Sequence, residues 1–253
     1  MYILLSPAKT MIQPFFEFNS FETSKPYFNN NAKLLNAAIK KLSKKELQNL
    51  MKLSDNLADD TYYHLHKWGN NNDENHPAVL TYFGTAFKYL NAQNWSDDTA
   101  IYAQNNLMIL SGLYGLLKPY DRVEKYRLEM GIKLNFLEGF KNLYDFWNQD
   151  IKNFLKEFKS DKTIINLASN EYIKMINKYQ YFDKIINCIF LQNSNGKLKV
   201  VANHSKAARG SMANFILQNK ITTPNQLKGY RDLNYQYSSI NSDDLNLVFI
   251  KKN

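Results

Sequence analysis

Short apolar runs bounded by polar or turn-forming residues predict where the strands lie. Runs of about four to eight apolar residues are typical of buried strands. The first run, Tyr2–Leu5, is ended by Ser6-Pro7. Asn195-Gly196 separates two later runs, and this dipeptide is typical of a β-hairpin because both residues tolerate positive φ. The predicted strands are Tyr2–Leu5, Ala78–Phe83, Lys162–Leu167, Ile185–Leu191, Leu198–Ala202 and Leu245–Ile250.

Segments with helix-capping residues at their starts predict the helices. Ser43 followed by Glu46 is a capping box, and it predicts a helix through about Leu53. Apolar residues recur with a helical period between Leu143 and Phe158. Further helices are predicted after Ser54 and Gly84, from Ser96 towards Leu107, from His204 to Asn219, and at the capped turn that starts with Thr223-Pro224.

Predicted strands near both ends and in the middle of the 253-residue chain indicate one folded unit. We expect an α+β fold, a single compact domain over residues 1–253 in which helices surround a mixed β-sheet. Such a unit would bury roughly 70–75% of the surface that its unfolded chain exposes. No apolar stretch approaches the roughly 20 residues of a membrane helix, so we expect a cytoplasmic protein without a membrane partner.

The net charge of +9 suits acidic partners, although an A·T-rich genome would also enrich the chain in lysine and asparagine. The distribution of charge is more informative than its total. From Lys184 to Arg231 the chain has eight basic residues and no aspartate or glutamate. Codon bias accounts for lysines but not for missing acids. This acid-free segment therefore predicts a surface that holds phosphate groups.

The histidines and the cysteine lack the spacing typical of a metal site. His64 and His66 lie two residues apart, which on a helix places them on different faces. The other histidines, His76 and His204, stand alone in the sequence. Cys188 is the single cysteine, and its apolar surroundings predict a core position. We therefore expect neither a metal nor a cofactor.

The segment from Ser6 to Thr10 follows the first predicted strand, and the carboxyl edge of a sheet often presents ligand contacts. Its two hydroxyls and the ammonium of Lys9 can bind phosphate or carboxylate. The segment lacks the glycines of a P-loop. A turn with a solvated lysine is the alternative.

Gly112 and Gly115 lie in a leucine-rich stretch that ends at Lys118-Pro119. Two glycines three residues apart indicate a tight backbone path between apolar elements. Hairpins between short helices in DNA-binding modules use such glycines to bring backbone amides close to a phosphate. A packed turn without a ligand is equally consistent with this stretch.

Several further basic residues are candidates for an anion site. Lys206 and Arg209 lie three residues apart on one face of a predicted helix, inside the acid-free segment. Arg127 could bind phosphate through two N–H groups, or Glu129 could neutralise it. The candidates for binding phosphate or nucleic acid are Ser6, Lys9, Thr10, Gly112, Gly115, Lys118, Arg122, Arg127, Asn166, Ser169, Lys206 and Arg209.

Asn166 and Ser169 lie at a predicted strand-to-helix transition, where polar side chains either cap the helix or face a pocket. Glu171 follows them and is the only obvious general base among these candidates. It is therefore the candidate catalytic residue.

Taken together, these segments resemble the YaaA family of peroxide-stress-resistance proteins. The resemblance keeps its order along nearly the whole chain. Its blocks are SPAKT at 6–10, MKLSDNLA at 51–58, LSGLYGLLKPYDRVEKYRLEMGIKL at 110–134, LYDFWNQDI at 143–151, NLASNEY at 166–172 and KAARG at 206–210.

The resemblance implies a cytosolic protein that limits hydrogen-peroxide damage, lowers reactive iron and protects DNA. It also implies a compact mixed fold with a positively charged cleft and a helix-hairpin-helix-like element. Of this chain's residues, the Gly112–Gly115 hairpin and the basic Lys9, Arg127, Lys206 and Arg209 match. Thr85 departs from the pattern, since an aspartate is expected after the glycine, and this puts any catalytic or cleft-lining role of that acid in doubt here.

Of two functions that the sequence leaves open, we expect the first. The first is binding of double-stranded DNA with weak sequence preference, mainly through phosphates; about five neutralised phosphates would give a log–log salt slope near −4 to −5. The alternative is an enzyme acting on a nucleotide or other phosphorylated small molecule, because scattered polar blocks are typical of a converging pocket. Direct iron storage is disfavoured, since no carboxylate–histidine helix motif is present.

Overall fold

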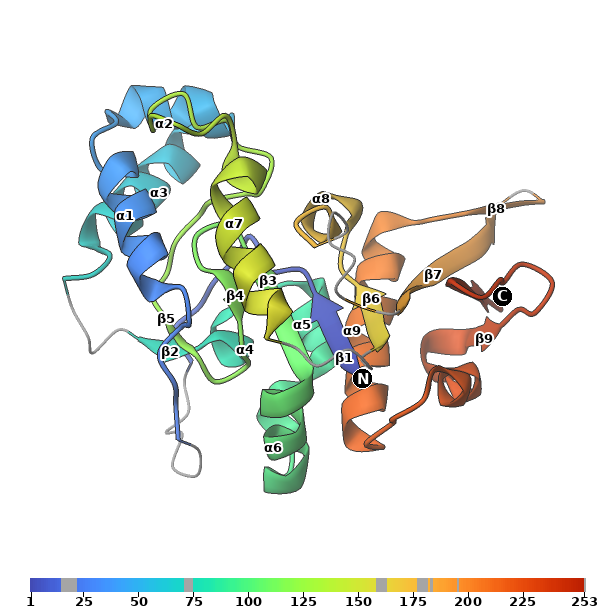
Figure 1. Ribbon diagram of the computed structural model, residues 1–253. Coiled ribbons are helices and arrows are strands. Elements are labelled where there is room, and N and C mark those ends of the chain that lie inside the picture. The colour runs from blue at the N-terminus through green and yellow to red at the C-terminus, as the bar shows by residue number, and fades with distance from the viewer. Residues whose placement is uncertain are drawn as a thin grey trace.

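The computed structural model of the chain describes residues 1–14, 22–70, 75–157, 163–176, 182, 184–194 and 196–252 (Figure 1). Its strands are β1 Tyr2–Leu5, β2 His76–Pro77, β3 Leu107–Ser111, β4 Gly115–Leu117, β5 Arg122–Val123, β6 Thr163–Leu167, β7 Lys184–Ser194, β8 Lys197–Lys199, β9 Tyr235–Tyr237 and β10 Asn246–Lys251. Its α-helices are α1 Asn29–Ile39, α2 Lys44–Met51, α3 Asp55–Lys67, α4 Ala78–Thr81, α5 Thr85–Leu90, α6 Asp97–Asn106, α7 Leu143–Lys156, α8 Asn170–Ile173 and α9 Ala202–Gln218. Short 3₁₀ helices cover Ala92–Asn94, Pro224–Gly229 and Asp232–Asn234.

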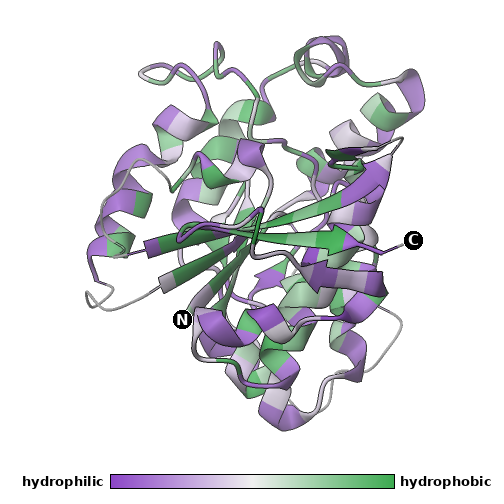
Figure 2. Cartoon of the chain, turned by 90° about the vertical axis from the view of Figure 1, so that its right-hand side faces the viewer, coloured by the Kyte–Doolittle hydropathy of each residue, from purple (hydrophilic) through white to green (hydrophobic). Residues whose placement is uncertain are grey.

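A mixed sheet lies at the centre of the protein, as predicted. Its strand order is β4-β3-β1-β6-β7-β10-β9, and β8 pairs with β7. β3, β1, β6, β7 and β10 run parallel to one another, whereas β4, β8 and β9 pair antiparallel with their neighbours. Figure 2 shows the apolar strands between helices on both sides. α9 packs against β1, β6 and β7, and α7 contacts β4. Buried apolar residues of the sheet and of the helices that cover it form one core.

Several local predictions are confirmed. Ser43 and Glu46 form the capping box at the start of α2. β7 and β8 form the predicted hairpin, although β8 ends at Lys199 and the chain turns into α9 at Ala202. Thr223 also forms a capping box at the start of its 3₁₀ helix. Lys162 and Phe158, the predicted start of one strand and end of one helix, lie outside the described residues.

The strand predicted over Ala78–Phe83 is wrong, because residues 78–81 form the short helix α4. The backbone N–H of Tyr82 donates to the carbonyl of Ala78, and the hydroxyl of Thr81 donates to the carbonyl of Pro77. The first N–H groups of the helix donate to carbonyls of Pro119 and Asp121 from a distant segment. A short buried apolar run fits either structure, and these long-range acceptors select the helix.

The helix-hairpin-helix arrangement predicted at Gly112 and Gly115 is also wrong for this stretch. The two glycines lie in a buried turn between the antiparallel strands β3 and β4. A Cβ at Gly112 would lie 2.3 Å from the carbonyl oxygen of Leu128. Gly115 has a φ of +71° and packs against the ring of Trp147. The glycines therefore allow a close packing of backbone and aromatic side chain inside the protein.

Candidate functional site

The order in which strands are added to the sheet reverses between the parallel strands β1 and β6. From β1 the chain continues to β3 on one side, whereas from β6 it continues to β7 and β10 on the other. In sheets of this kind the loops after such a pair of strands diverge and leave a crevice at their carboxyl ends. Here Ser6 Oγ accepts the backbone N–H of Ser169 at 2.8 Å and donates to its hydroxyl at 3.3 Å. The two loops are thus joined at the base of the crevice.

A cavity of about 410 Å³ opens at this point. It is formed by the loop after β1, the start of α5, the segment after β5, the β6–α8 connection and α9. Eight of the predicted site residues line it: Ser6, Lys9, Thr10, Arg127, Ser169, Glu171, Lys206 and Arg209. Segments separated by up to two hundred positions in the sequence therefore converge in one site.

Close packing of α5 against α9 places the helical side of the cavity. A Cβ at Gly210 would lie 1.9 Å from the carbonyl oxygen of Ala86, so only glycine allows this approach. Thr85, the position where the resemblance implies an aspartate, lines the cavity at the start of α5. Its hydroxyl donates to Asn203 Oδ1 on α9 at 3.0 Å. Thr85 thus joins the two helices and adds no negative charge.

Five predicted residues do not line this cavity. Gly112 and Gly115 are buried in the β3–β4 turn, and Lys118 borders a different cavity. Arg122 donates through Nε and Nη2 to the carbonyl of Asn75.

Asn166, the fifth of these residues, belongs to a row of asparagines across three strands. Its amide donates to Asn187 Oδ1 at 2.8 Å, and Asn187 donates to Asn246 Oδ1 at 3.0 Å. Its own Oδ1 accepts the N–H of Ala168. Asn166 therefore links β6 to β7 beside the site and does not line the cavity.

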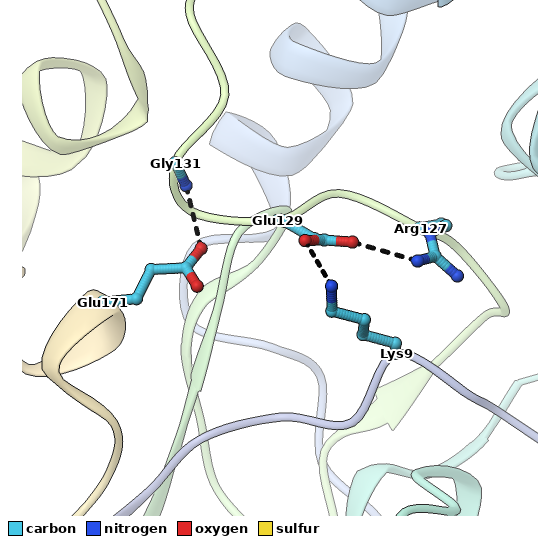
Figure 3. Close-up of polar contacts among 5 residues, drawn as sticks. All are labelled: Lys9, Arg127, Glu129, Gly131 and Glu171. Carbon is cyan, nitrogen blue, oxygen red and sulfur yellow. Dashed lines mark hydrogen bonds and ion pairs between the residues drawn. The ribbon is translucent and has the colours of Figure 1, made fainter. Parts of the chain in front are cut away.

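One side of the cavity, which we call the loop wall, consists of Lys9, Arg127 and Glu129. Figure 3 shows the carboxylate of Glu129 between the two cations. Its Oε2 lies 2.7 Å from Lys9 Nζ, and its Oε1 lies 3.0 Å from Arg127 Nη2. Glu129 thus neutralises Arg127, one of the two alternatives that the sequence leaves open, and it pairs with Lys9 as well.

The other side, which we call the helix wall, consists of Lys206 and Arg209 on α9. Within the described parts of the chain, neither side chain has a carboxylate at ion-pair distance. Arg209 is largely buried, and its Nε has no hydrogen-bond partner. Burial lowers the pKa of Arg209 from its usual value, because the charged guanidinium is desolvated. The helix wall therefore presents positive charge that the fold does not compensate.

The rest of the acid-free segment does not join this wall. Lys220 pairs with Asp98 at 3.0 Å, and Lys228 lies over the ring of Tyr237. Arg231 donates to two backbone carbonyls. These three residues thus have partners from elsewhere in the fold or from the backbone, whereas Lys197 and Lys199 are exposed on β8 and do not line the cavity.

Glu171, the candidate base, starts α8 at the edge of the cavity. Its Oε1 accepts the N–H of Gly131 at 3.0 Å (Figure 3), and its backbone carbonyl accepts the hydroxyl of Tyr144 at 2.9 Å. These contacts fix the orientation of Glu171. One carboxylate oxygen can still accept a proton or a hydrogen bond from a ligand.

Tyr126 and Tyr172 line the cavity, and the sequence analysis does not identify them as part of a site. The hydroxyl of Tyr126 is bonded to Ser111 Oγ at 2.6 Å and to the hydroxyl of Tyr82 at 2.7 Å. Burial raises the pKa of Tyr126 to about 12. Ser111 also accepts the N–H of Tyr114. A neutral hydrogen-bonded network of tyrosine and serine hydroxyls therefore lies beneath the charged cavity. The sequence gives no sign of this network, because a tyrosine among apolar residues is also typical of an ordinary core position.

Cys188 is buried, as predicted, and burial raises its pKa to about 12, so a thiol and not a thiolate lies there at neutral pH.

The described residues hold no cluster of three or more His, Cys, Asp or Glu side chains arranged to bind a metal. Nor does any helix in the described ranges have the length and apolar character needed to cross a membrane.

The family with the description "Peroxide stress protein YaaA" matches residues 1–241. The chain belongs to this family. The match includes every segment that lines the cavity and the buried β3–β4 turn. Membership of the YaaA family thus relates this protein to peroxide stress, and the cavity is its candidate functional site.

Proposed function

We propose that this member of the YaaA family binds a phosphorylated small molecule, of about nucleotide size, in the cavity at the carboxyl ends of β1 and β6. The observation that carries the proposal is the convergence of eight separately predicted polar residues in one cavity of about 410 Å³. Small-molecule sites typically enclose about 300–1,000 Å³. Duplex DNA, in contrast, needs cations spread along an extended surface.

The phosphate binds at the helix wall in this proposal. Arg209 supplies a planar fork of N–H donors, and the exposed Lys206 supplies a compact charge at the mouth. The hydroxyls of Thr10 and Ser169 are further hydrogen-bond donors along the cavity. Glu171 is the candidate general base for a reaction on the bound molecule. The contribution to peroxide resistance then acts through this ligand in the cytoplasm, and any effect on reactive iron is indirect.

Thermal unfolding with added ligands tests the proposal. AMP, ADP and ribose 5-phosphate should raise the unfolding temperature in a concentration-dependent way, since a ligand that binds only the native state stabilises it. Adenosine, which lacks a phosphate, should not. The matched variants are Lys206→Ala in the cavity and Lys197→Ala on the exposed strand β8. The first should abolish the shift and the second should preserve it; equal shifts in both variants would contradict the proposed site.

Binding of DNA is the second candidate, and the exposure of Lys9 and Lys206 at the mouth of the cavity favours it. These are the positions at which a phosphate backbone could pass. Fluorescence anisotropy with a 20-base-pair duplex at increasing salt tests this function. A log–log slope near −4 to −5 that changes by about two in the double variant K206A/R209A would support it. Binding that does not weaken with salt would exclude phosphate-backbone contacts.

A further inference from the structure

Glu129 contacts only one of the two N–H groups on the facing edge of the Arg127 guanidinium. Its Oε1 contacts Nη2 of Arg127, while its Oε2 contacts Lys9 (Figure 3). The Nε of Arg127 is buried and has no hydrogen-bond partner. Nε and Nη2 lie on the same edge of the guanidinium, the edge that binds two oxygens of one oxyanion. Glu129 therefore occupies only half of this edge.

Glu129 does not satisfy the whole loop wall in the free protein. Its Oε1 lies against Arg127 Nη2 and its Oε2 against Lys9 Nζ, and in this arrangement neither oxygen accepts from Arg127 Nε. A phosphoryl group has three terminal oxygens. It can accept from Nε and Nη2 of Arg127 and from the ammonium of Lys9 at the same time. The loop wall is thus better matched to a phosphoryl group than to the side chain that now occupies it.

Displacing Glu129 requires little rearrangement. The side chain of Lys9 is 64% exposed and that of Glu129 is 27% exposed, so water can solvate both when they separate. The exposed Lys9–Glu129 pair contributes little to stability, and the part-buried contact of Glu129 with Arg127 is replaced by contacts from the ligand. Arg127 is more buried than Lys9 or Glu129, with 19% of its side chain exposed, and its Nε has no hydrogen-bond partner.

We infer that Lys9 and Arg127 form a second phosphoryl subsite, which Glu129 occupies in the free protein and which a ligand takes by displacing that carboxylate. The inference rests on the proposed function, in which the helix wall binds the first phosphate. Because the two pairs of cations come from different elements of one cavity, the ligand class is a compound with two phosphoryl groups, such as a nucleoside diphosphate.

Calorimetric titration with AMP and ADP separates one phosphoryl group from two. Glu129→Gln should strengthen ADP binding about tenfold, since a competing charged contact is removed, and should change AMP binding less than about twofold. Glu171→Gln removes the same charge from the same cavity and should strengthen both nucleotides equally. Equal effects of Glu129→Gln on AMP and ADP, or no effect on either, would overturn the second subsite.

Lys9→Ala is an independent test that leaves the core intact, because Lys9 is exposed. It should lower the affinity for ADP about tenfold relative to that for AMP. An unchanged ratio contradicts the subsite even if Glu129→Gln fails to fold. If AMP and ADP bind to none of the proteins, wild type included, the proposed function itself is wrong and the second subsite falls with it.

Discussion

The β3–β4 turn and most of the cavity lining belong to the sequence blocks that resemble the YaaA family, yet the two regions differ in physical character. In the turn, Ser111, Gly112 and Gly115 are buried, and the carbonyl of Gly112 accepts the indole N–H of Trp147 at 2.9 Å. In the cavity, Arg127 and Arg209 each retain a buried N–H without a partner. Buried polar groups normally have partners, and the two unpaired Nε atoms in one cavity support the ligand site that we propose.

The two regions therefore place different demands on their residues. In the turn, packing leaves no room for a side chain at Gly112 or Gly115, whereas in the cavity Arg127 and Arg209 each keep an unpaired N–H. Changes in the turn and the tyrosine network beneath it should therefore reduce stability. Changes in the cavity should mainly reduce binding. Four predictions test this division, from the largest expected effect to the smallest.

Alkaline pH should produce the largest loss of stability. Burial raises the pKa of Tyr82, Tyr114 and Tyr126, so these phenols stay neutral in the folded protein while those of the unfolded chain ionise near pH 10. Stability is then fully present below about pH 10 and falls above it, by about 1.4 kcal/mol per pH unit for each tyrosine. Urea unfolding between pH 8 and 11.5 measures the slope. A constant free energy of unfolding across this range would contradict the neutral network.

Gly112→Ala should destabilise the protein by about 3 kcal/mol, because the new Cβ would meet a backbone carbonyl that cannot rotate away. Gly229→Ala is the matched control, since no atom lies within 4 Å of its added Cβ. The free energy of unfolding in urea should change by less than about 0.5 kcal/mol in the control. Equal stability of the two variants would show that the turn is not constrained by packing.

Tyr126→Phe should destabilise the protein by about 1–3 kcal/mol, because Ser111 and Tyr82 lose a buried hydrogen-bond partner. Tyr237→Phe, at a partly exposed position, serves as its control. Tyr126→Phe should also make the loss of stability with rising pH less steep, by the contribution of one buried tyrosine. Because Tyr126 lines the cavity as well, AMP binding measured in parallel would show whether the two regions are coupled.

Lys206→Ala should have the smallest effect on stability, less than about 0.5 kcal/mol, since Lys206 is exposed and lies at no ion-pair distance from a carboxylate of the described residues. Its effect should appear as lost ligand binding. A large loss of stability without a change in binding would reverse the division between the two regions.

The sequence by itself determined features that depend on neighbouring residues. The capping box of Ser43 and Glu46, the strand Tyr2–Leu5 and the β7–β8 hairpin follow from local hydrogen bonding, sterics and periodicity. The order of the short polar blocks also identified the family, and it singled out eight residues that meet in one cavity. Such features need no knowledge of which distant segments will touch.

Only the tertiary structure decided the rest, because long-range partners choose among locally equivalent states. Carbonyls of the segment around Asp121 made residues 78–81 helical, and the carbonyl of Leu128 made Gly112 a packing residue. Likewise, a cationic side chain is neutralised only if the fold brings a carboxylate to ion-pair distance from it. Glu129 neutralises Lys9 from far along the chain, whereas no carboxylate of the described residues lies at ion-pair distance from Arg209, and sequence distance carries no information about either.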